Sequence, residues 1–162
     1  MSGLSKQYEG LDNWGKVEFL TQLEFNNNVE KWNLLTRIIN DQEDYDLARI
    51  EALKILEIAS IPKKNKDLIA DSICNLIKNE VDYDVKNYAG VASANFFEYS
   101  CIQEVCQEKL LDNKEDIDLR YNYLDTLLKI PDKDKVRKVL EKLKEDSDLA
   151  KTARRNLKLL EG

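Results

Sequence analysis

The sequence predicts an all-α protein built from repeated pairs of helices. Apolar residues recur at helical spacing through nine segments, and no stretch of useful length alternates as a strand would. Glycine and proline are scarce, at five and two of 162 residues, which suits long helices joined by few tight turns. A short acidic turn also returns four times, and its second aspartates stand at positions 46, 84, 118 and 148. Intervals of this length are typical of helical repeat arrays.

The expected helices follow one another with short connections. Residues 1–11 show little periodicity and are expected to form a loose N-terminal arm. Asp12 can cap the first helix, and Asn26-Asn27-Asn28 gives a turn after it. Ile61-Pro62 and Ile130-Pro131 end two later helices, because the residue before proline avoids helical geometry. The nine expected helices span residues 12–26, 29–40, 45–60, 66–79, 83–99, 101–111, 119–130, 132–145 and 149–160.

The repeated turn has two aspartates one residue apart, then an apolar residue, then a cation two or three residues after the second aspartate. We expect the second aspartate to precede a helix, where it can accept a hydrogen bond from a free backbone N–H. Its charge also favours the positive helix end, and the cation can reach an aspartate nearby. The four copies are Asp44-Tyr45-Asp46-Leu47-Ala48-Arg49, Asp82-Tyr83-Asp84-Val85-Lys86, Asp116-Ile117-Asp118-Leu119-Arg120 and Asp146-Ser147-Asp148-Leu149-Ala150-Lys151.

This arrangement resembles HEAT-like repeats, in which a first helix ends in a turn with an aspartate and a second helix begins with an apolar residue and a cation. The resemblance implies a right-handed α-solenoid of about four helix pairs in a single domain. Residues 29–162 would form the array, residues 12–28 a capping helix, and residues 1–11 the arm. It also implies a ladder of carboxylate–cation pairs between repeats. The ladder pairs would be Asp46 with Arg49, Asp84 with Lys86, Asp118 with Arg120, and Asp148 with Lys151.

The composition restricts the chemistry that the chain can perform. Histidine, the commonest general base and metal ligand, is absent from the sequence. Cys74, Cys101 and Cys106 lack metal-binding or disulfide spacing and are interpreted as small buried apolar residues. No glycine-rich phosphate loop occurs, and none of the acidic turns has the ligand set of a calcium loop. We therefore predict no catalytic residue, no metal and no cofactor.

Charge and hydropathy restrict the kinds of partner that the chain is expected to bind. Residues 129–162 hold 11 basic and 7 acidic residues, whereas residues 1–128 hold 14 and 24. The acidic part should repel nucleic acid and attract a basic protein surface, while mixed charges suggest a solvated face at the basic end. The chain starts without a signal-peptide core, and no apolar run approaches the roughly 20 residues of a membrane span. We expect a cytoplasmic protein that contacts neither membrane nor nucleic acid.

A partner-binding stripe is predicted by aligning the second helices of the pairs, which line the concave face in HEAT-like arrays. Its mixture of aromatic, amide and charged side chains is typical of interfaces, with a solvated helix face as the alternative. Gly90, which costs about 1 kcal/mol against alanine in a helix, is interpreted as close helix packing, with a recess as the alternative. The stripe comprises Glu51, Lys54, Tyr88, Val91, Asn95, Asn122, Asp125 and Lys129.

The leading functional hypothesis is a non-catalytic protein-binding module. A small acidic helical-repeat chain resembles the immunity proteins of bacterial toxin–immunity systems, which implies that it occludes a cationic nuclease toxin. The alternatives are a HEAT-like enzyme, of the base-glycosylase or pigment-lyase type, and an adaptor subunit of a larger complex. The glycosylase fits poorly, because Trp14 and Trp32 lie in the acidic part of the chain. The carboxylates that would replace substrate phosphates are Asp44, Asp82, Asp116 and Asp125.

Overall fold

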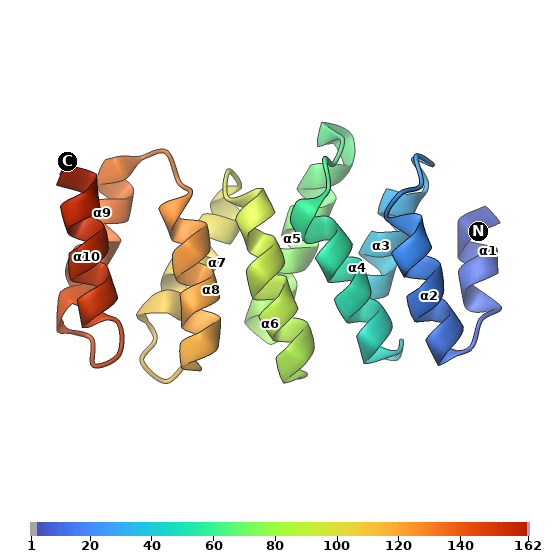
Figure 1. The fold of residues 1–162 in the computed structure, drawn as a ribbon, viewed down its shortest axis with the longest axis horizontal. Helices are drawn as coiled ribbons and strands as arrows, with labels where there is room; N and C mark the ends of the chain where they lie inside the picture. The colour runs from blue at the N-terminus through green and yellow to red at the C-terminus, as the bar shows by residue number, and fades with distance from the viewer. Residues whose placement is uncertain (1–2, 162) are drawn as a thin grey trace.

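The computed structural model describes residues 3–161, which form ten α-helices and two short 3-10 helices and contain no strand (Figure 1). The predicted all-α fold is confirmed, and each of the nine expected helices lies over one of α2 to α10. Within the described part of the chain, no helix is long and apolar enough to cross a membrane. In order, the elements are α1 (Gly3–Glu9), α2 (Asn13–Leu23), α3 (Lys31–Asn40), α4 (Asp46–Ile58), α5 (Lys63–Asn79), α6 (Tyr83–Ala92), η1 (Ser93–Phe96), α7 (Ser100–Leu111), α8 (Ile117–Leu128), α9 (Lys133–Lys142), η2 (Leu143–Glu145) and α10 (Ala150–Glu161).

The helices lie in two rows, and Figure 1 shows the even-numbered helices in front of the odd-numbered ones. In the rear row, α1, α3, α5, α7 and α9 contact one another in succession. In the front row, α2, α4, α6 and α8 do the same. From α3 onward, each rear helix also packs against the front helix that follows it in the chain. The apolar core therefore runs between the rows, from Leu4 in α1 to Leu157 in α10.

The N-terminal segment differs from its prediction. Residues 1–11 were expected as a loose arm, yet residues 3–9 form α1, while residues 1 and 2 lie outside the described part. Leu4 and Tyr8, one helical turn apart, are both buried. The Tyr8 hydroxyl donates to Asp44 Oδ2 at 2.8 Å, and burial together with this bond raises the pKa of Tyr8. A seven-residue helix is not stable alone, so these long-range contacts hold it.

Helix capping confirms one prediction and corrects another. The Asp12 side chain accepts a hydrogen bond from the Gly15 N–H at 2.8 Å and caps α2 as expected. In the repeated turns, however, the first aspartate accepts the backbone bonds, and the second lies at or near the start of the helix. There its charge still favours the positive helix end. The first aspartates that accept bonds from backbone N–H groups two or three residues ahead are Asp82, Asp116 and Asp146.

A ladder of ion pairs joins successive helix pairs, with partners other than those expected. The fourth residue of each of α2, α4, α6 and α8 is a cation. Each cation reaches a carboxylate in the loop that precedes the next front-row helix. Every ion pair therefore links one front-row helix to the segment just before the next one. The four pairs are Lys16–Asp44 (2.6 Å), Arg49–Glu80, Lys86–Glu115 (3.1 Å) and Arg120–Asp146 (2.5 Å).

The ladder expected within single turns is mostly wrong. Only Asp46 and Arg49 form an ion pair, with 3.4 Å between Oδ1 and Nη1. Two of the other expected pairs are separated by two residues, and such positions do not face each other on a helix. In the third, the carboxylate lies 3.9 Å from the Arg120 guanidinium instead. The expected pairs that do not form between described residues are Asp84 with Lys86, Asp118 with Arg120, and Asp148 with Lys151.

The Arg49–Glu80 pair is the most deeply buried of the four, with residue exposures of 1% and 8%. Arg49 also donates to the carbonyl of Ile39, at the end of α3, at 3.2 Å. Glu80 accepts the backbone N–H groups of Val81 and Asp82 at 3.0 Å each. Burial alone would raise the pKa of Glu80, but the hydrogen bonds from Arg49 and the backbone outweigh it and hold this pKa below its usual value. One guanidinium thus ties α3, α4 and the α5–α6 loop together.

Replacing Arg49 tests the buried pair. We expect Arg49→Met to lower the free energy of unfolding by about 3–5 kcal/mol, because Glu80 would remain buried without its counter-charge. Arg137→Met is the matched control, since Arg137 pairs with Asp134 on an exposed helix face, and should cost less than about 1 kcal/mol. Urea unfolding followed by circular dichroism measures both. Equal losses in the two variants would contradict a special role for Arg49.

Acid should lower the stability of the fold by protonating carboxylates of the ladder. The pKa values of Asp44, Glu80 and Asp146 are all lowered in the folded chain, so the unfolded state takes up protons first as the pH falls. Their stabilisation is present above about pH 4.5 and is lost as the pH drops through the lower folded values. Urea unfolding between pH 7 and pH 3 should show this decline. It should be shallower in Glu80→Gln than in Glu104→Gln, an exposed control; identical slopes would disprove the contribution of Glu80.

Candidate partner-binding surface

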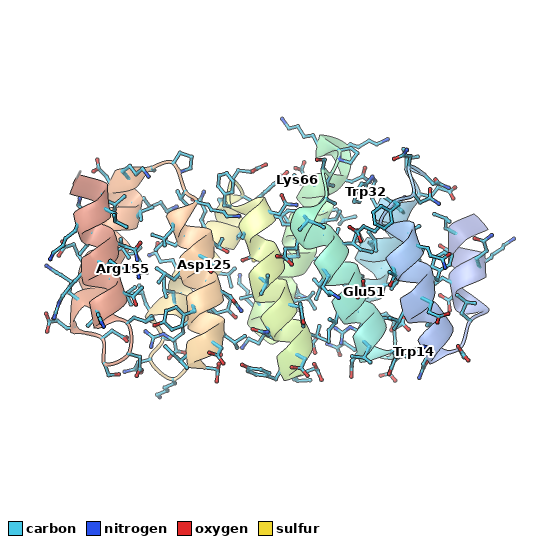
Figure 2. The ribbon with its side chains drawn as sticks, in the orientation of Figure 1. Trp14, Trp32, Glu51, Lys66, Asp125 and Arg155 are labelled. Carbon is cyan, nitrogen blue, oxygen red and sulfur yellow. The ribbon has the colours of Figure 1, made fainter. Side chains whose placement is uncertain are left out.

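The front row carries a groove where α4, α6 and α8 meet, with a volume of about 440 Å³. We call it the α4–α8 groove. The end of α4 supplies one side, the α6–η1 segment supplies apolar side chains in the middle, and α8 supplies the other side. Figure 2 shows Asp125 about midway along α8, the front-row helix next to α10. The lining residues are Glu57, Ile58, Val91, Ala94, Asn122, Asp125 and Lys129.

Close packing of α6 on α8 sets the position of this groove. A Cβ atom on Gly90 would lie 3.2 Å from Tyr123 Cε1 and 3.3 Å from Asn122 Cβ, so only glycine allows this approach without displacing its neighbours. The Asn122 amide also donates to Asn87 Oδ1 at 2.7 Å. Close packing is therefore the correct interpretation of Gly90. The groove opens on the next turn, at Val91.

The chain tightens after Ala92, where α6 continues as the 3-10 helix η1 instead of the uninterrupted helix expected to residue 99. Ser93 lies fully buried at this point, and its hydroxyl contacts Thr126 Oγ1 at 2.7 Å. The Asn95 amide donates to the carbonyls of Leu56 at 2.8 Å and Ala59 at 3.0 Å, at the end of α4. Asn95 thus fixes the end of the helix that carries Ile58.

The structure divides the predicted stripe. Four of its residues line the α4–α8 groove: Val91, Asn122, Asp125 and Lys129. The other four do not. Lys54 and Glu51 pair with each other at 2.8 Å on α4, Tyr88 packs half-buried against the core, and Asn95 bonds to the α4 backbone. Whether any of the eight contacts a partner stays a prediction.

Exposed apolar side chains beside the groove were missed by the sequence analysis. Phe25, Val29 and Ile58 are 80%, 60% and 68% exposed. They line a second hollow of about 410 Å³ between the α2–α3 and α4–α5 loops, and Ile58 belongs to both hollows. The buried face of Trp32 forms part of its wall, and the Lys31 ammonium lies 4.7 Å from the centre of that ring. Apolar residues flanking the Asn26–Asn28 turn were the available signal.

The carboxylates expected to replace phosphates are mostly engaged in the fold. Asp44 has a side-chain exposure of only 6% and accepts from Lys16 at 2.6 Å and from Tyr8 at 2.8 Å. Asp82 and Asp116 cap α6 and α8. Asp125 is the exception among these four, because it is exposed and has no hydrogen bond or ion pair with any described residue. The groove, not the turns, therefore offers free negative charge from this set.

Cysteine and metal chemistry do not add a second site. Cys74 and Cys106 are buried and Cys101 is half-buried, and all three thiols are free. Burial raises the pKa of Cys101 to about 11 and that of Cys106 to about 12, so both are protonated at neutral pH. Between residues 3 and 161, no group of three or more potential ligand side chains is placed to hold a metal ion.

Comparisons with protein-family models, curated proteins and solved structures found no match to the chain.

Replacing Asn95 tests its structural assignment. We expect Asn95→Ala to lower the free energy of unfolding by about 1–3 kcal/mol, because two carbonyls at the end of α4 lose their donor. Asn75→Ala on α5, where the side chain is exposed and bonds only to Asn79, should change stability by less than about 0.5 kcal/mol. Urea unfolding compares the two variants. An unchanged stability in Asn95→Ala would return Asn95 to the candidate binding residues.

Proposed function

We propose that the chain is a non-catalytic protein-binding module, built as a right-handed α-solenoid of about four HEAT-like helix pairs with α2 as a capping helix. Two observations support this proposal. Rear and front helices alternate along the chain, and each pair contacts the next. The carboxylate–cation ladder also recurs at the fourth residue of four front-row helices. Arrays of this kind present a long, semi-rigid surface to a partner.

The observation that carries the choice of partner is a pair of free carboxylates across the α4–α8 groove. Glu57 stands on α4 and Asp125 on α8, and neither has a hydrogen bond or ion pair with any described residue. Ile58, Val91 and Ala94 supply the apolar surface of the same groove. A lysine or arginine side chain matches this arrangement, because its stem packs on apolar surface while its cationic head meets a carboxylate. A basic protein surface is therefore the proposed partner.

The second hollow extends the surface beyond a single side chain. Phe25, Val29 and Ile58 expose apolar area next to the groove, as the centre of an interface requires, and charged residues surround them. Lys129 lines the groove and is exposed, whereas Lys31 lines the second hollow and is buried. Lys129 would repel a cation placed beside it and so helps to fix where a basic partner sits.

We further propose that the partner is a cationic toxin domain and that the module acts as its immunity protein by occlusion. The support is the acidic balance of residues 1–128 and the free carboxylates of the groove. In this role the chain works in the cytoplasm and requires neither nucleic acid nor cofactor. Of the four carboxylates expected to replace substrate phosphates, Asp125 keeps this role in the proposal. Glu57 is proposed as its partner instead of Asp44, Asp82 and Asp116.

Three variants test this proposal once a tagged chain has captured its partner from the native cell. Ile58→Asp, and Glu57→Gln combined with Asp125→Asn, should each weaken the purified complex by about ten-fold or more. Glu104→Gln combined with Glu108→Gln removes two exposed carboxylates from α7 in the rear row and should leave affinity unchanged. Isothermal titration measures each complex, and added salt should weaken binding of the unchanged chain. Wild-type affinity in both groove variants would refute the proposed surface.

A further inference from the structure

Helix α10 carries a cationic face that the proposed function does not use. Lys151, Arg154, Arg155 and Lys158 are all exposed, and no acidic residue occurs between positions 149 and 160. None of the four forms an ion pair with a described residue; Arg154 donates to a backbone carbonyl, that of Lys144, at 2.9 Å. Figure 2 shows Arg155 on α10, at the opposite end of the molecule from Trp14. We call these four residues the α10 face.

The spacing of the α10 face makes its charges repel one another. Positions 151 and 154, 151 and 155, 154 and 158, and 155 and 158 are three or four residues apart, so each pair lies side by side on the helix. Lys151 also lies in the first helical turn, where the positive helix end disfavours a cation. Front-row helices α4, α6 and α8 carry an aspartate in that turn. Helix stability therefore accounts for Lys158, near the C-terminus, but not for the other three.

The cations of the α10 face also differ from those of the ladder. Lys16, Arg49, Lys86 and Arg120 are each neutralised by a carboxylate from the next unit. α10 is the last helix that the structure describes, and its fourth residue is Ala153, which is buried. Its cations point away from the packed side, which Leu149, Ala153 and Leu157 occupy. A ligand for this face must therefore supply the missing negative charge from outside the molecule.

The surroundings of the face select the kind of anion. The segment before α10 holds Glu145 and Asp148, besides Asp146, which is paired with Arg120, so carboxylates border the cations at the start of the helix. A long polyanion or an anionic bilayer would press its phosphates against this border, well within the ~10 Å over which charges interact at ordinary ionic strength. A short segment of about the length of the helix, roughly 18 Å, would avoid it. Ala153 and Leu157 on α10 are buried, and Leu159 is the one large apolar side chain of its described residues that is exposed, so the helix has little apolar surface with which to enter a lipid bilayer.

We infer that the α10 face is a second interaction surface and that it binds an acidic peptide segment of another protein. Its partner has the charge opposite to the one proposed for the α4–α8 groove. The chain would then join a basic and an acidic partner at separate places along one rigid body. The two surfaces share no residue, so either can be tested without the other.

A labelled peptide of five glutamates, about 17 Å long when extended, tests this inference on the full chain by fluorescence anisotropy. Wild-type protein should bind the peptide, and four glutamine substitutions at Lys151, Arg154, Arg155 and Lys158 should weaken binding at least ten-fold. The matched control carries glutamine at Lys6, Lys63, Lys64 and Lys78, which are exposed, make no ion pair with a described residue, and lie on other helices. It removes the same charge and should bind as the wild type does.

Four outcomes would overturn the inference. The first two are a wild type that does not bind the peptide and an equal loss of peptide affinity in the two quadruple variants. The third is tighter binding of a ten-nucleotide single strand, or of anionic vesicles, through the same four residues. The fourth is displacement of the peptide by self-association of the chain. Light scattering at the peptide-binding concentration detects the last of these. Circular dichroism of both quadruple variants shows whether the fold is kept, and exposed glutamines are compatible with a helix.

Discussion

The ion pair between Arg49 and Glu80 is the contact on which the rest of the structure most depends. A buried guanidinium is costly, and here the Glu80 carboxylate and the Ile39 carbonyl both accept from Arg49 Nη2, while Arg49 Nε is buried without a hydrogen-bond partner. The planar, branched head of arginine can serve two acceptors in different elements, which the single ammonium of lysine does less well. Arg120 repeats the arrangement, with the Leu110 carbonyl at 2.9 Å and Asp146 at 2.5 Å. Lysine occupies the two less buried positions of the ladder, Lys16 and Lys86.

The ion pairs and helix caps inside the fold determine which charged side chains remain free on the surface. The turn carboxylates are consumed by capping and by the ladder, so the acidic turns that dominate the sequence are largely structural. Free carboxylates remain on the α4–α8 groove, at Glu57 and Asp125, where apolar side chains lie between them. On α10, Lys151, Arg154, Arg155 and Lys158 form no ion pair with any described residue. The ladder of ion pairs therefore leaves free carboxylates at the α4–α8 groove and unpaired cations on α10.

Local signals were enough to predict the helices and the Asp12 cap, because each depends on neighbours in the chain. The cost of a glycine inside a helix indicated close packing at Gly90, but not its partners Asn122 and Tyr123 on α8. The missed features depend on contacts across the fold. α1 is too short and polar to be recognised from periodicity and is held by Tyr8 and Leu4. The ladder partners Glu80 and Glu115 lie 31 and 29 residues from their cations, and side-chain direction decides the pairing. The exposure of Phe25, just after α2, and of Ile58, the last residue of α4, likewise depends on how the helices pack across the fold.

A double-mutant cycle on Arg120 and Asp146 is the most direct test of the ladder between units. Arg120→Met, Asp146→Asn and the double variant are compared with the wild type by urea unfolding, and asparagine can still accept the backbone N–H groups of the turn. If the ladder couples the last two helix pairs, the cycle should give an interaction free energy of about 1 kcal/mol or more. Additive losses, within about 0.3 kcal/mol, would show that the units are held together by apolar packing alone.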